Sequence, residues 1–225
     1  MSIKQNLEEI QKKINNVCKI CGRNPSDVTI LAVTKTRTAE EINEVIELGI
    51  VNVGENRVQE LISKYDSVSD KARWHLIGNL QKNKVKYIAD KVCMIHSVDS
   101  ISLAEEIDRR CKKINKIMDI LIEVNISGEE SKSGISPDKI YDFIDIVQNL
   151  ENVKIQGLMT MAPRLAPEDE LHIIFSSLTS LSKDISSHSY KNVSMHYLSM
   201  GMSGDYEIAI CEGSDIVRIG TALFK

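Results

Sequence analysis

The stretch VTILAVTKTRTAEEINEVIELGIVNV, residues 28–53, decides the fold of this chain. Its first part, residues 28–35, is an apolar and β-branched run that is typical of a buried strand. Residues 39–48 then repeat their apolar side chains with helical spacing, and Gly49 stands where helices commonly stop. A second strand pattern follows at residues 50–53. The stretch therefore predicts a unit in which two parallel strands are joined by a helix.

The same alternation continues to the end of the sequence. Strand patterns recur at residues 73–77, 92–97, 118–126, 153–159, 192–199 and 215–219, and helical patterns at 57–65, 81–89, 100–113, 137–150, 168–185 and 206–211. This order favours an α/β fold, with residues 1–225 forming a single (β/α)8 barrel of the TIM type. A doubly wound open sheet is the alternative, although such a sheet usually has fewer strands.

The N-terminal segment has the pattern of an amphipathic helix. Little chain follows the last predicted strand, so we expect this N-terminal helix to cover the barrel where the eighth helix would lie. The segment carries charges throughout and has no continuous apolar stretch, which is unlike a signal peptide or a membrane span. We therefore expect a cytoplasmic protein.

The composition excludes several classes of function. The chain has 225 residues, of which 42% are hydrophobic and 27% charged, as in ordinary globular proteins. Its net charge of −4 gives no electrostatic reason to expect nucleic acid or an anionic membrane as a partner. Nothing in the sequence marks an interface between subunits, and we expect a monomer.

The cysteines do not suggest a disulfide framework. There are five of them, an odd number, in a chain with no secretion signal. Cys18 and Cys21 form a CxxC motif inside the first helical pattern, which we attribute to chance because a zinc ribbon would need a second pair.

Lys35 closes the first predicted strand. The carboxyl ends of barrel strands meet at one mouth, where barrel enzymes carry their functional residues. Partial desolvation of the amine at that position would lower its pKa and free it for attack on a carbonyl group. A lysine that simply leaves the strand for solvent is the alternative interpretation.

The last two strand ends have the composition of a phosphate site. Ser199, Gly201 and Ser203 precede the predicted helix at 206–211, and Gly220 and Thr221 follow the last strand. Small residues with free backbone N–H groups before a helix bind anions, and barrels commonly bind phosphate after strands seven and eight. Two glycine-containing turns with a helix cap are the alternative.

The other strand ends are polar and rich in glycine. Asn56 follows the second predicted strand, and Arg218 lies on the last one. The strand ends together hold no cluster of carboxylates or histidines, so no metal site is predicted. His75 lies between Trp74 and Leu76 and is interpreted as a core histidine with satisfied hydrogen bonds. An amine facing a phosphate site suggests a phosphorylated aldehyde held as a Schiff base, and pyridoxal 5′-phosphate is the obvious candidate.

Six motifs resemble those of the pyridoxal phosphate homeostasis proteins, the YggS/PROSC-like family. They are AVTKT (32–36), GENRVQE (54–60), WHLIGNLQKNK (74–84), GLMTMAP (157–163), LSMGMSGDYEIAI (198–210) and VRIGTALF (217–224). The resemblance runs from about residue 28 to the C-terminus. It implies a barrel similar to the N-terminal domain of alanine racemase. It also implies that this barrel binds the cofactor without an established reaction.

The resemblance also implies roles for individual residues. Lys35 resembles the lysine that forms the Schiff base, Arg218 the arginine facing the pyridine nitrogen, and Asn56 a residue close to the ring. The positions that resemble the phosphate loops are Ser199, Gly201, Ser203, Gly220 and Thr221, and which serine hydroxyl contacts the phosphate stays open. The implied partners are pyridoxal phosphate, free amino acids, and apo-enzymes that receive the cofactor.

Two other functions are weighed against a cofactor-binding homeostasis protein. A racemase-like enzyme would need a second base, which alanine racemase takes from a tyrosine of a C-terminal domain. This sequence ends just after its last predicted strand, and none of its six tyrosines clearly lies at the mouth. An aldolase-type barrel would form its Schiff base with the substrate, and it would leave Arg218 unexplained. The homeostasis protein is therefore the favoured interpretation.

Overall fold

Eight parallel strands close into a barrel in the order of the sequence, with β8 pairing back onto β1. The computed structural model describes residues 2–129, 133–163 and 165–225. The strands are β1 Thr29–Val33, β2 Asn52–Glu55, β3 Arg73–Leu76, β4 Met94–Val98, β5 Met118–Glu123, β6 Val153–Met159, β7 Val193–Met202 and β8 Ile216–Ile219. The closed barrel predicted from the sequence is therefore confirmed.

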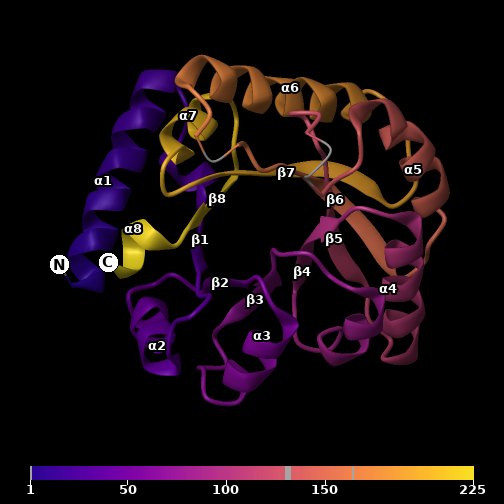
Figure 1. Ribbon diagram of the computed structural model, residues 1–225, viewed down its shortest axis with the longest axis horizontal. Helices are drawn as coiled ribbons and strands as arrows, with labels where there is room; N and C mark the ends of the chain where they lie inside the picture. Colours follow the sequence, from indigo (N-terminus) through magenta and orange to yellow (C-terminus); the bar gives the residue numbers. More distant parts are fainter. Residues whose placement is uncertain (1, 130–132, 164) are drawn as a thin grey trace.

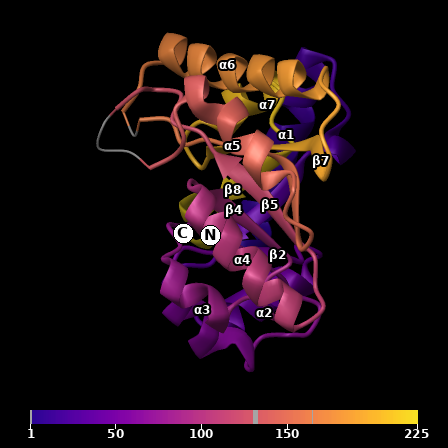
Figure 2. The same cartoon turned by 90° about the vertical axis from the view of Figure 1, so that its right-hand side faces the viewer.

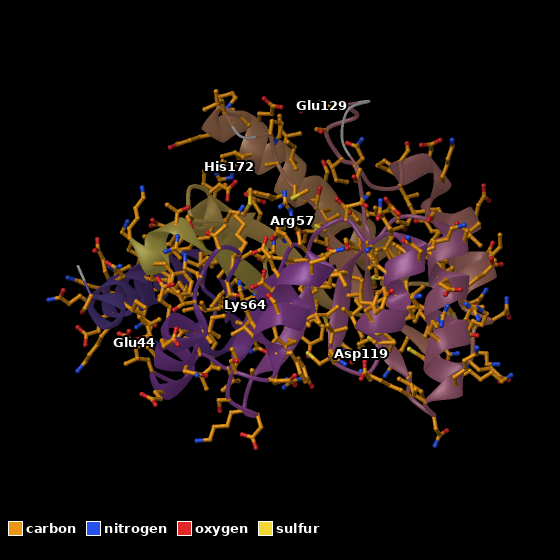
Figure 3. All side chains as sticks on the ribbon, turned by 60° about the horizontal axis from the view of Figure 1, so that its bottom comes forward. Glu44, Arg57, Lys64, Asp119, Glu129 and His172 are labelled. Atoms are coloured by element: carbon orange, nitrogen blue, oxygen red, sulfur yellow. A yellow bond between two sulfur atoms is a disulfide. The ribbon has the colours of Figure 1, made fainter. Side chains whose placement is uncertain are left out.

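Helices surround the barrel (Figures 1 and 2). The α-helices are α1 Ile3–Cys21, α2 Ala39–Glu47, α3 Val58–Tyr65, α4 Ile101–Lys113, α5 Ile140–Val147, α6 Glu168–Ser186, α7 Tyr206–Cys211 and α8 Thr221–Phe224. The described residues also contain three short 3₁₀ helices, η1 Pro25–Asp27, η2 Lys82–Tyr87 and η3 Pro137–Lys139. Charged side chains such as Glu44 of α2 are exposed on the outer surface of this ring (Figure 3).

The side chains of each strand alternate between the barrel interior and the helices. On β1, Leu31 points inward, where it packs with Ile77 and Ile216. Its neighbours Ile30 and Ala32 belong to a different apolar cluster, together with residues of α1. Because successive side chains of a strand point to opposite faces, every second residue at a strand end is directed towards the mouth.

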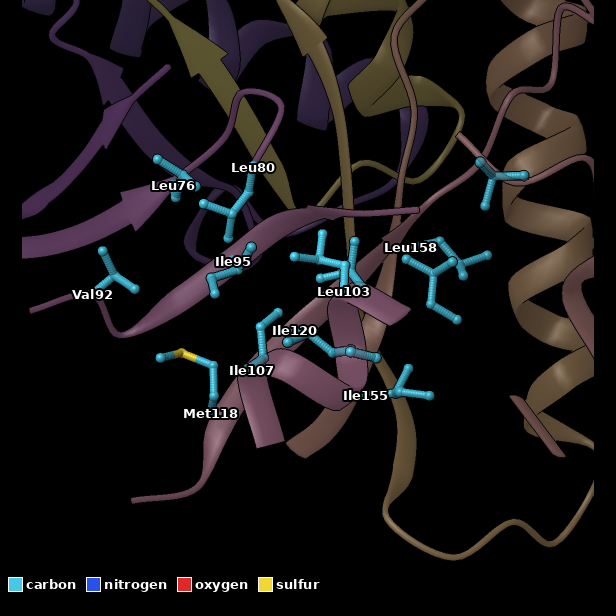
Figure 4. Packing of buried hydrophobic residues seen from close by; sticks show 14 of the residues in the cluster. Leu76, Leu80, Val92, Ile95, Leu103, Ile107, Met118, Ile120, Ile155 and Leu158 are labelled. Atoms are coloured by element: carbon cyan, nitrogen blue, oxygen red, sulfur yellow. The ribbon is translucent and has the colours of Figure 1, made fainter. Parts of the chain in front are cut away.

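Most of the apolar core lies between the strands and the outer helices. Figure 4 shows part of it, where Leu76 of β3, Ile95 of β4 and Ile120 of β5 pack with Leu103 and Ile107 of α4. All five side chains are buried. Burial of each such side chain stabilises the fold by roughly 1.5–3 kcal/mol.

The N-terminal helix takes the place of the missing eighth outer helix, as predicted. Its residues Leu7, Ile10 and Ile14 are buried against Ile30 of β1 and Val217 of β8. The helix after β8, α8, has only four residues. The two termini consequently lie side by side in Figure 1, where the Asn6 amide donates to the carbonyl groups of Leu223 and Lys225 at 3.0 and 2.8 Å. No described helix is long and apolar enough to cross a membrane.

Outside the predicted site, the expectations for residues 81–89 and for the cysteines are wrong. The segment predicted as a helix at 81–89 contains only the 3₁₀ helix η2, in which Val85 and the adjoining Ile88 are buried. A spacing of three residues puts both side chains on one face of a 3₁₀ helix. A disulfide also joins Cys21 to Cys211, because α1 packs along α7 and brings together the last residues of the two helices.

Candidate functional site

The carboxyl ends of β1, β2, β7 and β8 form the part of the mouth that carries the predicted site residues. Gly220, just after β8, lies against the end of β1: a Cβ atom at Gly220 would be 3.3 Å from Val33 Cβ. The turn with Lys35 begins two residues beyond Val33. The predicted amine and the second phosphate loop thus follow adjacent strands.

Lys35 is exposed and lies on the turn between β1 and α2. The expected desolvation of its amine is therefore wrong for this structure. The chain leaves the strand at Thr34, whose Oγ1 donates to the Glu55 carboxylate at 2.8 Å, and Thr36 adopts a left-handed conformation with φ of 61°. This sharp turn carries the Lys35 side chain to the surface of the molecule.

Ser203 connects the two predicted phosphate loops. Its hydroxyl oxygen accepts from the backbone N–H groups of Gly220 at 3.3 Å and Ala222 at 3.2 Å. Gly201 lets this loop pack on α7, because a Cβ atom there would be 2.6 Å from Ala209 Cβ. Its φ of 87° is likewise unfavourable for other residues. Thr221 is exposed at the start of α8.

Ser199 belongs to the barrel interior. Its side chain is fully buried, and its hydroxyl oxygen accepts from Arg218 Nη1 at 2.8 Å. The same hydroxyl lies 3.0 Å from His96 Nδ1. The structure thus separates the two serines, since Ser203 contacts the backbone of the second loop whereas Ser199 contacts Arg218.

Arg218 is a buried cation, with only 3% of its surface exposed. Besides the Ser199 hydroxyl, it donates to the Ser199 carbonyl at 2.8 Å and to the Thr160 carbonyl at 3.0 Å. A guanidinium group has more N–H donors than these bonds use, and the rest have no acceptor among the described residues. Burial lowers the pKa of Arg218 to about 10, against the opposing effect of Asp205 and Glu123, which leaves the group charged at neutral pH.

A chain of hydrogen bonds crosses the barrel interior from Arg218. His96 Nε2 lies 3.0 Å from His75 Nδ1, and His75 Nε2 lies 3.2 Å from Asn52 Oδ1. Burial lowers the pKa of His75 to about 3 and that of His96 well below 6.5, so both rings are neutral. The Asn52 Oδ1 atom can only accept, so His75 Nε2 donates to it. Because each neutral ring has a single N–H group, His96 Nε2 then donates to His75 Nδ1, and the Ser199 hydroxyl donates to His96 Nδ1. His75 is a satisfied core histidine, as predicted.

Two carboxyl groups, those of Asp205 and Glu123, act electrostatically on Arg218 and oppose the lowering of its pKa by burial. Glu123 of β5 is 3% exposed, and none of the described residues donates a hydrogen bond to its carboxylate. Burial, assisted by the charge of Asp99 and opposed by that of Arg218, raises the pKa of Glu123 to about 7. Burial also raises the pKa of Asp205, which a hydrogen bond from the Met202 N–H and the charge of Arg218 partly oppose. A charged residue within the apolar run 118–126 was the only sequence signal for Glu123.

Asn56 follows β2 and has an incomplete set of hydrogen bonds. Its Oδ1 atom is buried and has no partner among the described residues. A Cβ atom at Gly78 would lie 2.4 Å from the Asn56 carbonyl oxygen, so the next strand end fixes the backbone here. A buried oxygen without a donor is costly unless a ligand satisfies it.

Comparison with known proteins places this geometry in context. A family model described as "Alanine racemase, N-terminal domain" matches residues 5–225. The pyridoxal phosphate homeostasis protein of Aquifex aeolicus is 43% identical over 225 residues, which cover 100% of this chain and 98% of that protein. The protein with the same description from Pseudomonas aeruginosa is 35% identical over 99% of this chain and 95% of its own length.

Solved structures agree with these matches. PipY of Synechococcus elongatus, solved with pyridoxal phosphate bound, has a TM-score of 0.84 at 31% identity and covers 95% of this chain and 100% of its own. The crystal structure of an unknown protein from Bifidobacterium adolescentis has a TM-score of 0.95 at 36% identity and covers 99% of this chain and 94% of its own. An alanine racemase of Clostridium difficile shares the fold, with a TM-score of 0.73 at 15% identity over 99% of this chain and 55% of its own.

Proposed function

We propose that this chain, which belongs to the pyridoxal phosphate homeostasis proteins within the alanine racemase N-terminal domain family, binds pyridoxal 5′-phosphate covalently through Lys35 and supplies it to other proteins without catalytic turnover. The unit proposed to do this is the single barrel domain over residues 1–225. The observation that carries the proposal is the buried Arg218, which keeps unused N–H donors and pairs in register with Met202, the last residue of β7. The relative PipY, whose solved structure contains the same cofactor, supports it.

The donors at the strand ends fit a phosphate group. The N–H groups of Gly220 and Ala222 converge on the Ser203 hydroxyl through long bonds of 3.3 and 3.2 Å. The backbone N–H groups of Ser203, Gly204 and Thr221 have no acceptor among the described residues. Backbone donors of this kind, with a hydroxyl beside them, suit a phosphate. Gly201, Ser203, Gly220 and Thr221 would hold it.

Arg218 and Asn56 fit the ring of the cofactor. Arg218 can only donate, so it suits a ring nitrogen that stays unprotonated, and Ser199 contributes by orienting the guanidinium group. The unpaired Asn56 oxygen suits a hydroxyl donor such as the one on the pyridine ring. When bound, the cofactor supplies an aldehyde that condenses with primary amines and a ring that withdraws electrons. An unprotonated ring withdraws electrons weakly, which favours holding the cofactor over catalysis.

Covalent attachment to Lys35 is tested by reduction and mass spectrometry. Protein incubated with pyridoxal phosphate should develop a visible absorbance band that borohydride abolishes, and the reduced adduct should map to the peptide with Lys35. The Lys35→Ala variant should form no adduct, whereas Lys71→Ala, which changes an exposed lysine before β3, should behave as wild type. An adduct on another lysine would contradict the proposed attachment.

Free amino acids are proposed to compete with Lys35 for the cofactor, and apo-enzymes to receive it. Added amino acids should therefore shift the absorbance of the loaded protein. Incubation with an apo-enzyme should restore that enzyme's activity as the visible band of this protein declines. Restoration no faster than that given by the same amount of free cofactor would argue against direct supply.

A racemase-like activity is the second candidate, and Glu123 is the observation that favours it. This carboxyl group is buried in β5, and its pKa of about 7 suits a general acid or base at neutral pH. With L-alanine in heavy water, a binding protein should leave the α-proton signal unchanged over hours. Rapid loss of that signal in wild type, but not in Glu123→Gln, would favour the enzyme instead.

A further inference from the structure

The backbone on both sides of Lys35 is held by one helix. Lys64 Nζ donates to the Thr34 carbonyl at 2.9 Å, and the Thr36 N–H donates to Glu60 Oε2 at 2.9 Å. Lys64 and Glu60 lie four residues apart on α3, and their charged groups are 3.7 Å apart. The carbonyl before Lys35 and the amide after it are therefore fixed by a pair of opposite charges. Figure 3 labels Lys64 on α3.

The Lys64 ammonium group is in turn fixed from the barrel side. It donates to Glu55 Oε1 at 2.8 Å, and the same oxygen accepts from Thr34 Oγ1 at 2.8 Å. Glu55 is fully buried, and its Oε2 atom has no partner among the described residues. Such a buried ion pair is a poor source of stability, because desolvation offsets the attraction and the unpaired oxygen adds a further cost. Stability therefore does not explain why Lys64 and Glu55 form this buried ion pair.

The conformation of Thr36 shows what the ion pair holds in place. A β-branched residue with φ of 61° is strained, and such strain persists only where surrounding contacts fix it. The contacts here are the Glu60 carboxylate on Thr36 and the hydrogen bond from the Arg37 N–H to the Thr34 carbonyl at 3.0 Å. Lys64 is itself unsuited to attack an aldehyde, because its ammonium group already binds the Thr34 carbonyl and Glu55.

We propose that Lys64 and Glu60, supported by Glu55, are positioning residues that preset the Lys35 turn for covalent attachment of the cofactor. This inference rests on the proposed function and extends it to residues that do not themselves touch the cofactor. Misplacing a reacting group by about 1 Å can reduce a rate by about 100-fold. The turn thus contributes to the covalent step and leaves the phosphate contacts, which come from β7 and β8, unaffected.

The test separates covalent attachment from reversible binding. The variants are Glu60→Gln, Lys64→Met, and the double variant Lys64→Met with Glu55→Gln. The double variant removes both charges of the buried ion pair, so it leaves no unpaired carboxylate in the interior that could prevent folding. Each variant should attach pyridoxal phosphate about 10- to 100-fold more slowly than wild type in stopped-flow absorbance. Each should bind pyridoxine 5′-phosphate, which has no aldehyde, within about twofold of the wild-type affinity, because positioning leaves the phosphate contacts unchanged.

Lys116→Met is the matched control. Lys116 also donates from its ammonium group to two backbone carbonyls, those of Ala89 and Val92, but it precedes β5 at the opposite end of the barrel. This control should attach the cofactor at the wild-type rate. Unchanged attachment in the Glu60 and Lys64 variants would overturn the positioning role, as would an equal loss of binding for both ligands. If wild type itself formed no adduct on Lys35, the proposed function would fail as well.

Discussion

At the scale of single residues, Glu123 shows how burial controls the charge of the mouth. Its pKa is raised from an ordinary 4.5 to about 7, mainly by burial. Between these two values the folded protein holds a proton that the unfolded chain releases. Stability therefore falls as pH rises from about 4.5 to 7. At higher pH the folded state must bury a carboxylate for which the described residues provide no hydrogen bond.

We predict that Glu123→Gln stabilises the protein at pH 8 but not at pH 4.5. The gain at pH 8 should be about 1–3 kcal/mol, since each pKa unit corresponds to about 1.4 kcal/mol. Urea unfolding at the two pH values would measure it. Glu105→Gln, which changes an exposed glutamate of α4, should keep the wild-type pH dependence. Equal stability of wild type and Glu123→Gln at pH 8 would contradict the prediction.

The two serines of β7 and its loop should respond differently to the loss of their hydroxyl groups. Ser199→Ala removes an acceptor from the charged Arg218 and a donor from His96, and it should destabilise the protein by about 1–3 kcal/mol even without ligand. Ser203→Ala exposes backbone donors at the mouth, so it should change stability little and weaken binding of pyridoxine 5′-phosphate by roughly 1–3 kcal/mol. Thermal unfolding and calorimetric titration of both variants would distinguish these effects. A similar pattern in both would show that Ser199 also contacts the phosphate.

At the scale of elements, the bounds of helices and strands are predicted most accurately where the apolar pattern is uninterrupted. The bounds of β6 and α7 agree with the predicted 153–159 and 206–211, because each has one uninterrupted pattern. The strand predicted at 192–199 runs from Val193 to Met202 in the structure. The sequence suggested a loop at Gly201, but this residue, with its φ of 87°, lies within β7. Position at a strand end is the sequence signal for Lys35 and Arg218 as predicted site residues. It could not select Lys64, whose role depends on how α3 packs against the β1 turn.

The disulfide between α1 and α7 joins Cys21 to Cys211, which are 190 residues apart in the sequence. The sequence alone could not show that these two cysteines lie in contact. Closing so long a loop restricts the unfolded chain, and we predict that the bond contributes about 2–4 kcal/mol to stability. A reducing agent should therefore lower the unfolding temperature of wild type and leave that of Cys21→Ser unchanged. Thiol titration of the unfolded, unreduced protein should detect only Cys18, Cys93 and Cys111. Five reactive thiols would show that the bond is absent.

At the scale of the whole molecule, the barrel closes where the first and last strands meet. β1 pairs with β8 in parallel, and α1 covers this seam from outside. The proposed site draws on the same strands, since Lys35 follows β1 and the phosphate donors follow β7 and β8. A ligand bound there would connect the two ends of the sequence across the seam. Its effect on stability should therefore be uneven around the barrel.

We predict that pyridoxine 5′-phosphate protects the seam and raises the unfolding temperature of the whole protein. At a concentration about 100 times its dissociation constant, a ligand stabilises the folded state by about 2.7 kcal/mol, which corresponds to roughly 5–10 °C for a chain of this size. Hydrogen exchange should slow most in residues 30–36 and 198–223 and least in α4, which lies on β5 and β6. Lys35→Ala should keep this protection, because the phosphate contacts do not involve the amine. Pyridoxine without its phosphate should give little protection. Uniform slowing around the barrel, or equal protection by both compounds, would place the ligand elsewhere than at the β1–β8 seam.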